Sequence, residues 1–77
     1  MPRYYFHQYS NGGRFEDRKG AILRSAAEAC TYAVHRTPAL LMVAIRESGN
    51  DNFIATEISD GARTLFVVRG KIIIEKV

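Results

Sequence analysis

The chain has 77 residues, of which 47% are hydrophobic, and eleven Lys or Arg against eight Asp or Glu give a formal net charge of +3. This length predicts a single domain over residues 1–77. The charge is far below that of a histone-like tail, so it permits an anionic partner without requiring one.

The first predicted strand covers residues 2–10, in which aromatic and polar side chains alternate. Alternation places Tyr4, Phe6 and Gln8 on one face of this strand. The other face carries rings interleaved with a cation: Arg3, Tyr5, His7 and Tyr9. This second face is the best candidate for a functional surface.

A turn at residues 11–13 (NGG) follows, because asparagine and glycine accept positive φ angles. It lacks the strand–GxGxxG–helix context of a phosphate loop, so a hairpin is the preferred interpretation. Residues 14–18 are expected to return as a second strand with Phe15 facing inward. Residues 17–20 (DRKG) make another turn, and residues 21–23 lead the chain into a helix.

Residues 25–47 are the only segment with helical periodicity, and we expect the other elements to form around them. Ser25 and Glu28 have the spacing of a capping box, in which each side chain accepts a hydrogen bond from the other residue's backbone N–H. Small residues recur at three- and four-residue steps in the first half, and bulkier ones in the second. Such a stripe would let the helix lie close to a sheet.

Pro38 interrupts this helix, because an interior proline lacks the N–H donor and clashes with the preceding turn, at a cost of about 3 kcal/mol. One solution is a kinked helix, or a second helix capped by Thr37. The alternative is that the helix ends near Arg36 and residues 39–47 form a strand, since apolar residues also alternate there. Residue propensities favour the helix. Residues 48–52 (SGNDN) end the segment in either case.

Two more strands are predicted after the helix. Residues 53–59 and 63–69 form a hairpin about Asp60-Gly61, which is a strong turn signal. Residues 71–77 are expected to continue as strand. A free edge there would promote aggregation, so this segment should pair with the first strand or with another subunit. The candidate assembly edge consists of Ile72, Ile73 and Ile74.

These elements predict a two-layer α+β fold. An antiparallel sheet of four or five strands would carry one kinked or split helix across one face, in ββαββ order. A domain of this size buries only about 60% of its unfolded surface, and one helix covers one face of a sheet. The surplus of apolar residues therefore predicts a homo-oligomer, most simply a dimer, or another partner.

Several segments form a recurring pattern: MPRYYFH at residues 1–7, Gly12-Gly13, Phe15, Asp17, Gly20, an alanine-rich helix at residues 26–33, and residues 58–61 (ISDG). With this pattern the chain resembles a family of small bacterial proteins that begin MPRYFFH and carry a D-x-x-G turn. The resemblance covers the chain to about Val68 and implies a strand–strand–helix–strand–strand order. It implies no assigned activity and no catalytic residues. The chain departs from the pattern at Pro38, in its apolar second half of the helix, and in its isoleucine-rich end.

The reactive side chains do not predict an enzyme, a metal site or a cofactor site. His7 and His35 are far apart in the sequence, whereas a tetrahedral metal site needs four converging donors. Cys30 and His35 are separated by about 140° around a helix, so Cys30 is interpreted as a small core residue. Glu16 and Asp17 would point to opposite faces of a strand, and we interpret them as a solvated, charge-mixed edge.

The aromatic face leads to two functional hypotheses. The candidate interaction face is Arg3, Tyr5, His7 and Tyr9, with Arg69 and Lys71 from the returning strand. In the preferred hypothesis the chain is a small non-enzymatic interaction module, homodimeric, that buries this face or residues 72–74 and binds a regulatory protein. The alternative is a nucleic-acid-binding protein whose rings stack on bases and whose arginines contact phosphates. The sequence carries no ribonucleoprotein motif, which favours the first.

The expected location is a reducing cytoplasm. The single cysteine excludes an internal disulfide. The start of the chain lacks the basic and apolar regions of a secretory signal, and no apolar run approaches the length of a membrane span. No membrane partner is therefore expected.

Overall fold

The computed structural model describes residues 1–48 and 53–77, and the predicted turn residues Gly49, Asn50, Asp51 and Asn52 lie outside that part. The described residues form five strands and one helix. In chain order these are β1 (Arg3–Ser10), β2 (Gly13–Phe15), β3 (Ala21–Ile22), α1 (Ala26–Ser48), β4 (Phe53–Ser59) and β5 (Thr64–Lys71).

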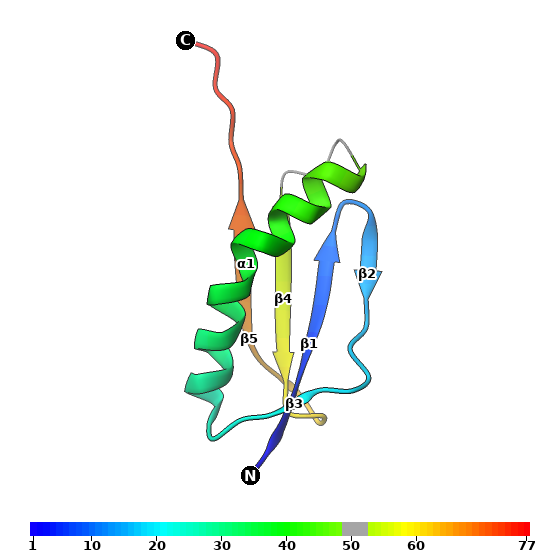
Figure 1. Cartoon of the computed structure of the whole chain (residues 1–77), viewed down its shortest axis with the longest axis vertical. Helices are drawn as coiled ribbons and strands as arrows, with labels where there is room; N and C mark the ends of the chain where they lie inside the picture. The colour runs from blue at the N-terminus through cyan, green and yellow to red at the C-terminus, as the bar shows by residue number, and fades with distance from the viewer. Residues whose placement is uncertain (49–52) are drawn as a thin grey trace.

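The strands form one antiparallel sheet in the order β2-β1-β4-β5, with β3 also paired to β1. β2 pairs with β1 at Gln8, Tyr9 and Ser10, and β3 pairs with it at Arg3 and Tyr4, so both lie along the same edge of β1. α1 crosses one face of the sheet (Figure 1). The predicted two-layer α+β fold and its ββαββ order are confirmed, with β3 as a short addition.

The strand predictions are accurate at the centre of the sheet and wrong in places at its edges. β4 covers the predicted residues 53–59, and the returning strand extends to Lys71. The second strand ends at Phe15 rather than at residue 18, because the next segment turns back toward β1 through Asp17. The predicted strand over residues 71–77 is wrong, since β5 ends at Lys71 and residues 72–77 are exposed and irregular.

The helix begins where its cap predicts. The Glu28 backbone N–H donates to Ser25 Oγ at 3.2 Å, which satisfies one of the free donors of the first turn. The Glu28 carboxylate lies 3.8 Å from Arg24 Nε, on the exposed side of that turn. Local sequence is therefore enough to place this end of α1.

α1 continues through Pro38 to Ser48, so the strand alternative for residues 39–47 is wrong. Figure 1 shows that the helix bends in its middle, as a proline in a helix interior requires. Thr37 Oγ1 donates to the Ala33 carbonyl at 2.8 Å in the turn before the proline. The result is a single kinked helix whose second half takes a new direction over the sheet.

The core lies between the first half of α1 and the middle of the sheet. Buried helix residues recur at every fourth position: Ala29, Ala33, Thr37 and Leu41. Two of them, Ala29 and Ala33, form the core cluster with Ile58 of β4 and Tyr4 of β1. α1 lies close to β5 at Gly70, where an added Cβ would lie only 2.6 Å from Thr37 Cγ2. Small residues on both elements therefore set the distance between the helix and the sheet.

Phe15 does not point into this core, contrary to the prediction. It shares a face with Gln8 on the helix side of the sheet but is 68% exposed. α1 packs chiefly against β4 and β5. It therefore leaves the β1–β2 side of that face with less cover.

Candidate functional site

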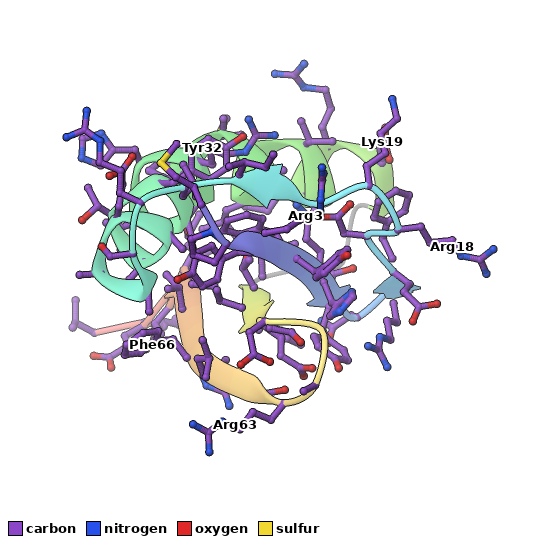
Figure 2. All side chains as sticks on the ribbon, turned by 90° about the horizontal axis from the view of Figure 1, so that it is seen from below. Arg3, Arg18, Lys19, Tyr32, Arg63 and Phe66 are labelled. Carbon is purple, nitrogen blue, oxygen red and sulfur yellow. The ribbon has the colours of Figure 1, made fainter. Side chains whose placement is uncertain are left out.

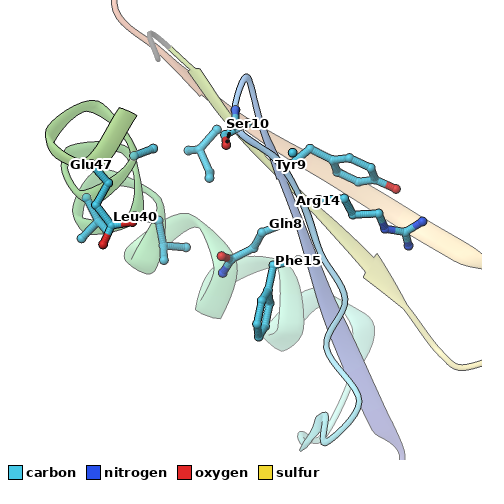
Figure 3. Close-up of a pocket in the computed structure, with 12 residues that line it drawn as sticks. Gln8, Tyr9, Ser10, Arg14, Phe15, Leu40 and Glu47 are labelled. Carbon is cyan, nitrogen blue, oxygen red and sulfur yellow. Dashed lines mark hydrogen bonds between the residues drawn. The ribbon is translucent and has the colours of Figure 1, made fainter. Parts of the chain in front are cut away.

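The face of the sheet opposite α1 contains the residues that the sequence singled out. Figure 3 shows Tyr9 and Arg14 on one side of the β1–β2 hairpin, with Gln8 and Phe15 on the side of the helix. Tyr5 and His7 share the face of Tyr9 through strand alternation. We call this surface the open face.

On the open face, residues that pair across neighbouring strands form a row. Tyr9 pairs with Arg14 of β2 and with Ala55 of β4, which in turn pairs with Arg69 of β5. The Arg14 guanidinium lies 5.0 Å from the centre of the Tyr9 ring, a cation–π contact. Because Ala55 is small, Tyr9 and Arg69 line one shallow hollow with it. A tyrosine is thus set between two arginines.

A carboxylate that the sequence analysis did not single out lies in the middle of the open face. Glu57 accepts hydrogen bonds from Tyr9 Oη at 2.7 Å and from Thr64 Oγ1 at 2.9 Å. The hydrogen bond to Glu57 raises the pKa of Tyr9, and the bonds from Tyr9 and Thr64 lower the pKa of Glu57. The carboxylate therefore holds three strands together and places a negative charge among the cations.

The other two rings of the open face hold neighbouring loops. Tyr5 and His7 lie parallel, with ring centres 6.4 Å apart and planes within 6°. His7 Nδ1 accepts a hydrogen bond from the Asp17 backbone N–H at 3.1 Å, which requires the neutral imidazole. The Tyr5 ring lies beside the backbones of Gly20 and Gly61. Both rings are half-buried and have structural contacts.

Asp17 is the anchor of the loop between β2 and β3. Its Oδ2 accepts the Phe6 backbone N–H at 3.0 Å, and its Oδ1 accepts those of Lys19 and Gly20, also at 3.0 Å. Burial alone would raise the pKa of Asp17, but the hydrogen bonds from Gly20, Phe6 and Lys19 hold that pKa below its ordinary value. The interpretation of Asp17 as part of a solvated edge is therefore wrong.

Gly20 completes the same loop. Its φ is +68°, and an added Cβ would lie 2.7 Å from the Tyr4 carbonyl oxygen and 2.9 Å from Arg3 Cγ. Only glycine fits this combination of angle and space. The D-x-x-G spacing is thus explained as a loop clamp rather than a reactive motif.

The predicted cations occupy different positions. Arg3 Nη1 donates to the Lys19 carbonyl at 2.8 Å, so its guanidinium supports the loop (Figure 2). Arg69 and Lys71 pair with Ala55 and Phe53 of β4, which puts both on the open face near the end of β5. Arg14 joins them there, although the sequence analysis did not select it. Strand alternation and hairpin register were the signals that could have found it.

The outer edge of β5 is a second candidate surface. β5 is the last strand of the sheet, and no strand among the described residues pairs with its outer side. Phe66 and Val67 on this strand are 42% and 44% exposed. Beyond Lys71, residues 72–77 (the tail segment) extend away from the body of the domain (Figure 1). Within the tail segment Ile73 is 68% exposed and Ile74 is 93% exposed.

A groove runs between the second half of α1 and the β1–β2 hairpin. Leu40 and Glu47 line it from the helix, and Gln8 and Phe15 from the sheet (Figure 3). It follows from the bend at Pro38 and from the position of α1 over β4 and β5. Its lining is mixed, with apolar side chains along both walls.

Two further candidates from the sequence, Cys30 and His35, lie on α1. Cys30 is a free, half-buried thiol against the core, and His35 is exposed on the helix. Across residues 1–48 and 53–77, no three His, Cys, Asp or Glu side chains gather as a metal site would require. In the same part of the chain, no helix is long and apolar enough to cross a membrane.

Comparison with known proteins finds a family but no annotated relative. The sequence model of a domain of unknown function (DUF6894) matches residues 3–70. No curated protein and no solved structure matches the chain. The matched range contains the Asp17–Gly20 clamp and all of β5 except its last residue, Lys71, whereas the tail segment lies beyond it.

Proposed function

The chain belongs to this family of domains of unknown function, and from its own geometry we propose that it is a small non-enzymatic interaction module that forms a homodimer. The observation that carries the proposal is the unpaired outer edge of β5, continued by three exposed isoleucines. An exposed apolar edge of this kind is a template for pairing with another chain.

The energies are of the right size for such a dimer. Fully covering an isoleucine is worth about 1.5–3 kcal/mol, and association costs about 4–15 kcal/mol. Covering three isoleucines from each of two copies would be worth at most six such terms, and less at Ile72, which is only 39% exposed, so the gain is of the same order as the cost of association. Backbone hydrogen bonds along the paired edges would add to the affinity and fix the geometry.

Sedimentation of the chain over a concentration series tests this proposal. We expect a monomer–dimer equilibrium that Ile73→Asp shifts to monomer, because the substitution would bury an unpaired charge in the interface. Phe15→Asp is the matched control, since Phe15 is 68% exposed, as Ile73 is, and lies on β2 at the opposite edge of the sheet. A wild-type chain that stays monomeric at every concentration would contradict the proposal.

Nucleic-acid binding is a second candidate, and one observation favours it. The Arg14–Tyr9–Ala55–Arg69 row sets an aromatic ring between two cations on a surface that the helix does not cover. Glu57 weighs against it, because its carboxylate would repel phosphates from the middle of this row.

Binding of a labelled single-stranded RNA and of a labelled single-stranded DNA, both of mixed sequence, distinguishes the nucleic-acid-binding protein from the interaction module. If the open face binds them, affinity falls steeply with salt and drops in a Tyr5→Ala, Tyr9→Ala double variant. Tyr32→Ala is the control, since that ring packs against Phe6 on the helix side. No binding at low salt would remove this candidate and leave the interaction module.

Three finer expectations belong to the same proposal. A regulatory protein partner is supported by the groove beside α1, which has apolar side chains along both walls. Cytoplasmic location is supported by the single, free cysteine. Membership of a bacterial group that begins MPRYFFH is supported by the opening residues and by the D-x-x-G spacing, which here forms the Asp17–Gly20 clamp.

A further inference from the structure

The charges that flank the three isoleucines point to the partner of the β5 edge. Residues 71–75 read Lys-Ile-Ile-Ile-Glu, so a cation and an anion lie at equal distances from Ile73. We propose that this segment pairs antiparallel with the same segment of a second copy, about a two-fold axis at Ile73. The inference rests on the proposed homodimer and assigns its register.

In this arrangement the two strands are complementary along their whole length. Lys71 faces the partner's Glu75, and symmetry forms that pair twice. Ile72 faces the partner's Ile74, also twice, and Ile73 faces its own copy. Directly opposed side chains in an antiparallel pair have Cβ atoms about 4.5–5.5 Å apart, close enough for both kinds of contact.

The structure leaves this segment free to pair. β5 ends at Lys71, where it is bonded to β4 through Phe53, and the following residues have no strand partner among the described residues. The irregular step in the β4–β5 ladder lies at the opposite end of β5, beside Ser59. The end of β5 nearest the tail segment therefore offers a regular edge that a second strand can extend.

Other registers are less favourable. If the two-fold axis lay at Gly70, Lys71 would lie opposite the partner's Arg69, which has the same charge. If the strands paired in parallel, each charged residue would lie opposite its own copy. An axis at Ile72 keeps one kind of ion pair, between Arg69 and the partner's Glu75, but it sets Lys71 against an isoleucine. Like charges directly opposed destabilise a strand pair, whereas opposite charges stabilise it.

A charge-swap experiment tests the register. Lys71→Glu and Glu75→Lys each turn two attractive pairs into two repulsive ones, so each should weaken the homodimer at least about tenfold at low salt. Mixing the two variants should recover dimerisation as a heterodimer, because both pairs again join opposite charges. The Lys71→Glu, Glu75→Lys double variant should recover the homodimer. Lys76→Glu is the control, since Lys76 would face the partner's Gly70.

The outcomes separate the register from the dimer itself. If Glu75→Lys weakens the dimer while Lys71→Glu does not, the axis lies at Ile72 and this inference is wrong, although the homodimer stands. If both variants dimerise as the wild type does, or mixing restores nothing, the segment is not the interface. A wild-type chain that never dimerises overturns the proposed function together with this inference.

Discussion

The two edges of this sheet are finished in different ways. At one edge the chain covers itself, because β2 and β3 both pair with β1 and the Asp17 carboxylate accepts the Phe6 N–H between them. At the other edge β5 has no neighbour among the described residues, and the tail segment continues past it with its isoleucines exposed. We call the β1 edge the closed edge and the β5 edge, with the tail segment, the open edge. The closed edge is held by polar side chains and a glycine, whereas the open edge exposes apolar side chains.

This difference shows where the fold ends and where an interaction surface begins. Unpaired backbone groups at a sheet edge must bond to water or to another strand, and proteins usually protect them. Here β1 is protected by β2, by β3 and by the Asp17 carboxylate. The absence of comparable protection at β5, in the described part of the chain, is the main reason to expect a partner there.

The largest expected effect is at the closed edge, where Gly20→Ala should lower the free energy of unfolding by at least about 3 kcal/mol. The substitution adds backbone strain at φ +68° to a collision with the Tyr4 carbonyl oxygen. Gly61→Ala is the control, because its φ is also positive but its Cβ meets only the Tyr5 ring at 3.4 Å. Urea denaturation of both variants measures the difference, and equal losses would show that the close approach is unimportant.

The next effect concerns how β5 is held without an outer neighbour. Gly70→Ala should cost about 2–3 kcal/mol, since the new Cβ would lie 2.6 Å from Thr37 Cγ2. Thr37→Ser removes that methyl group and keeps the hydroxyl that donates to the Ala33 carbonyl. The double variant should therefore regain much of the loss in thermal unfolding. If it regains nothing, the helix does not secure β5 at this point.

Asp17→Asn should lower the free energy of unfolding by about 1–2 kcal/mol near neutral pH, because a charged acceptor of three backbone N–H groups is replaced by an amide. Since its pKa is lowered in the folded state, the stabilisation is present above the unfolded pKa of about 3.9 and is lost as pH falls through the folded value. The wild type should thus lose more stability than the variant between about pH 5 and pH 2.

Denaturation across that pH range measures this difference. Glu16→Gln is its control, because Glu16 is exposed. Its carboxylate has one long contact, 3.8 Å from Nε of Arg18, which is exposed as well. That substitution should change stability by less than about 0.5 kcal/mol. Parallel pH curves for wild type and Asp17→Asn would show that Asp17 is not the anchor of the closed edge.

The smallest effect on the fold is expected at the open edge. A chain that ends at Lys71 should keep its free energy of unfolding within about 0.5 kcal/mol in dilute solution, because the removed residues are exposed. At high concentration the full chain should gain stability from dimerisation, and the shortened chain should not. Thermal unfolding at two concentrations checks both statements, and a shortened chain that is unstable when dilute would mean that the tail segment belongs to the fold.

The sequence predicted the candidate site unevenly. Alternation alone put Tyr5, His7 and Tyr9 on one face, and the hairpin register put Arg69 and Lys71 there too. The sequence did not predict Glu57, whose partner Tyr9 is 48 positions away, or the role of Asp17, which bonds to a residue 11 positions away. A carboxylate looks the same in sequence whether it faces water or several hydrogen-bond donors.

Local signals were enough to predict the Ser25 cap, the hairpin at Asp60-Gly61, the span of β4 and the two-layer fold. Local signals were not enough to establish that α1 continues through Pro38, that β3 exists, or that β5 ends at Lys71. These features depend on contacts between distant segments. The packing of Thr37 over Gly70 and the hydrogen bonds of Asp17 both stabilise the fold through residues far apart in the chain. Their contributions to the free energy of folding therefore cannot be estimated from any short stretch of sequence.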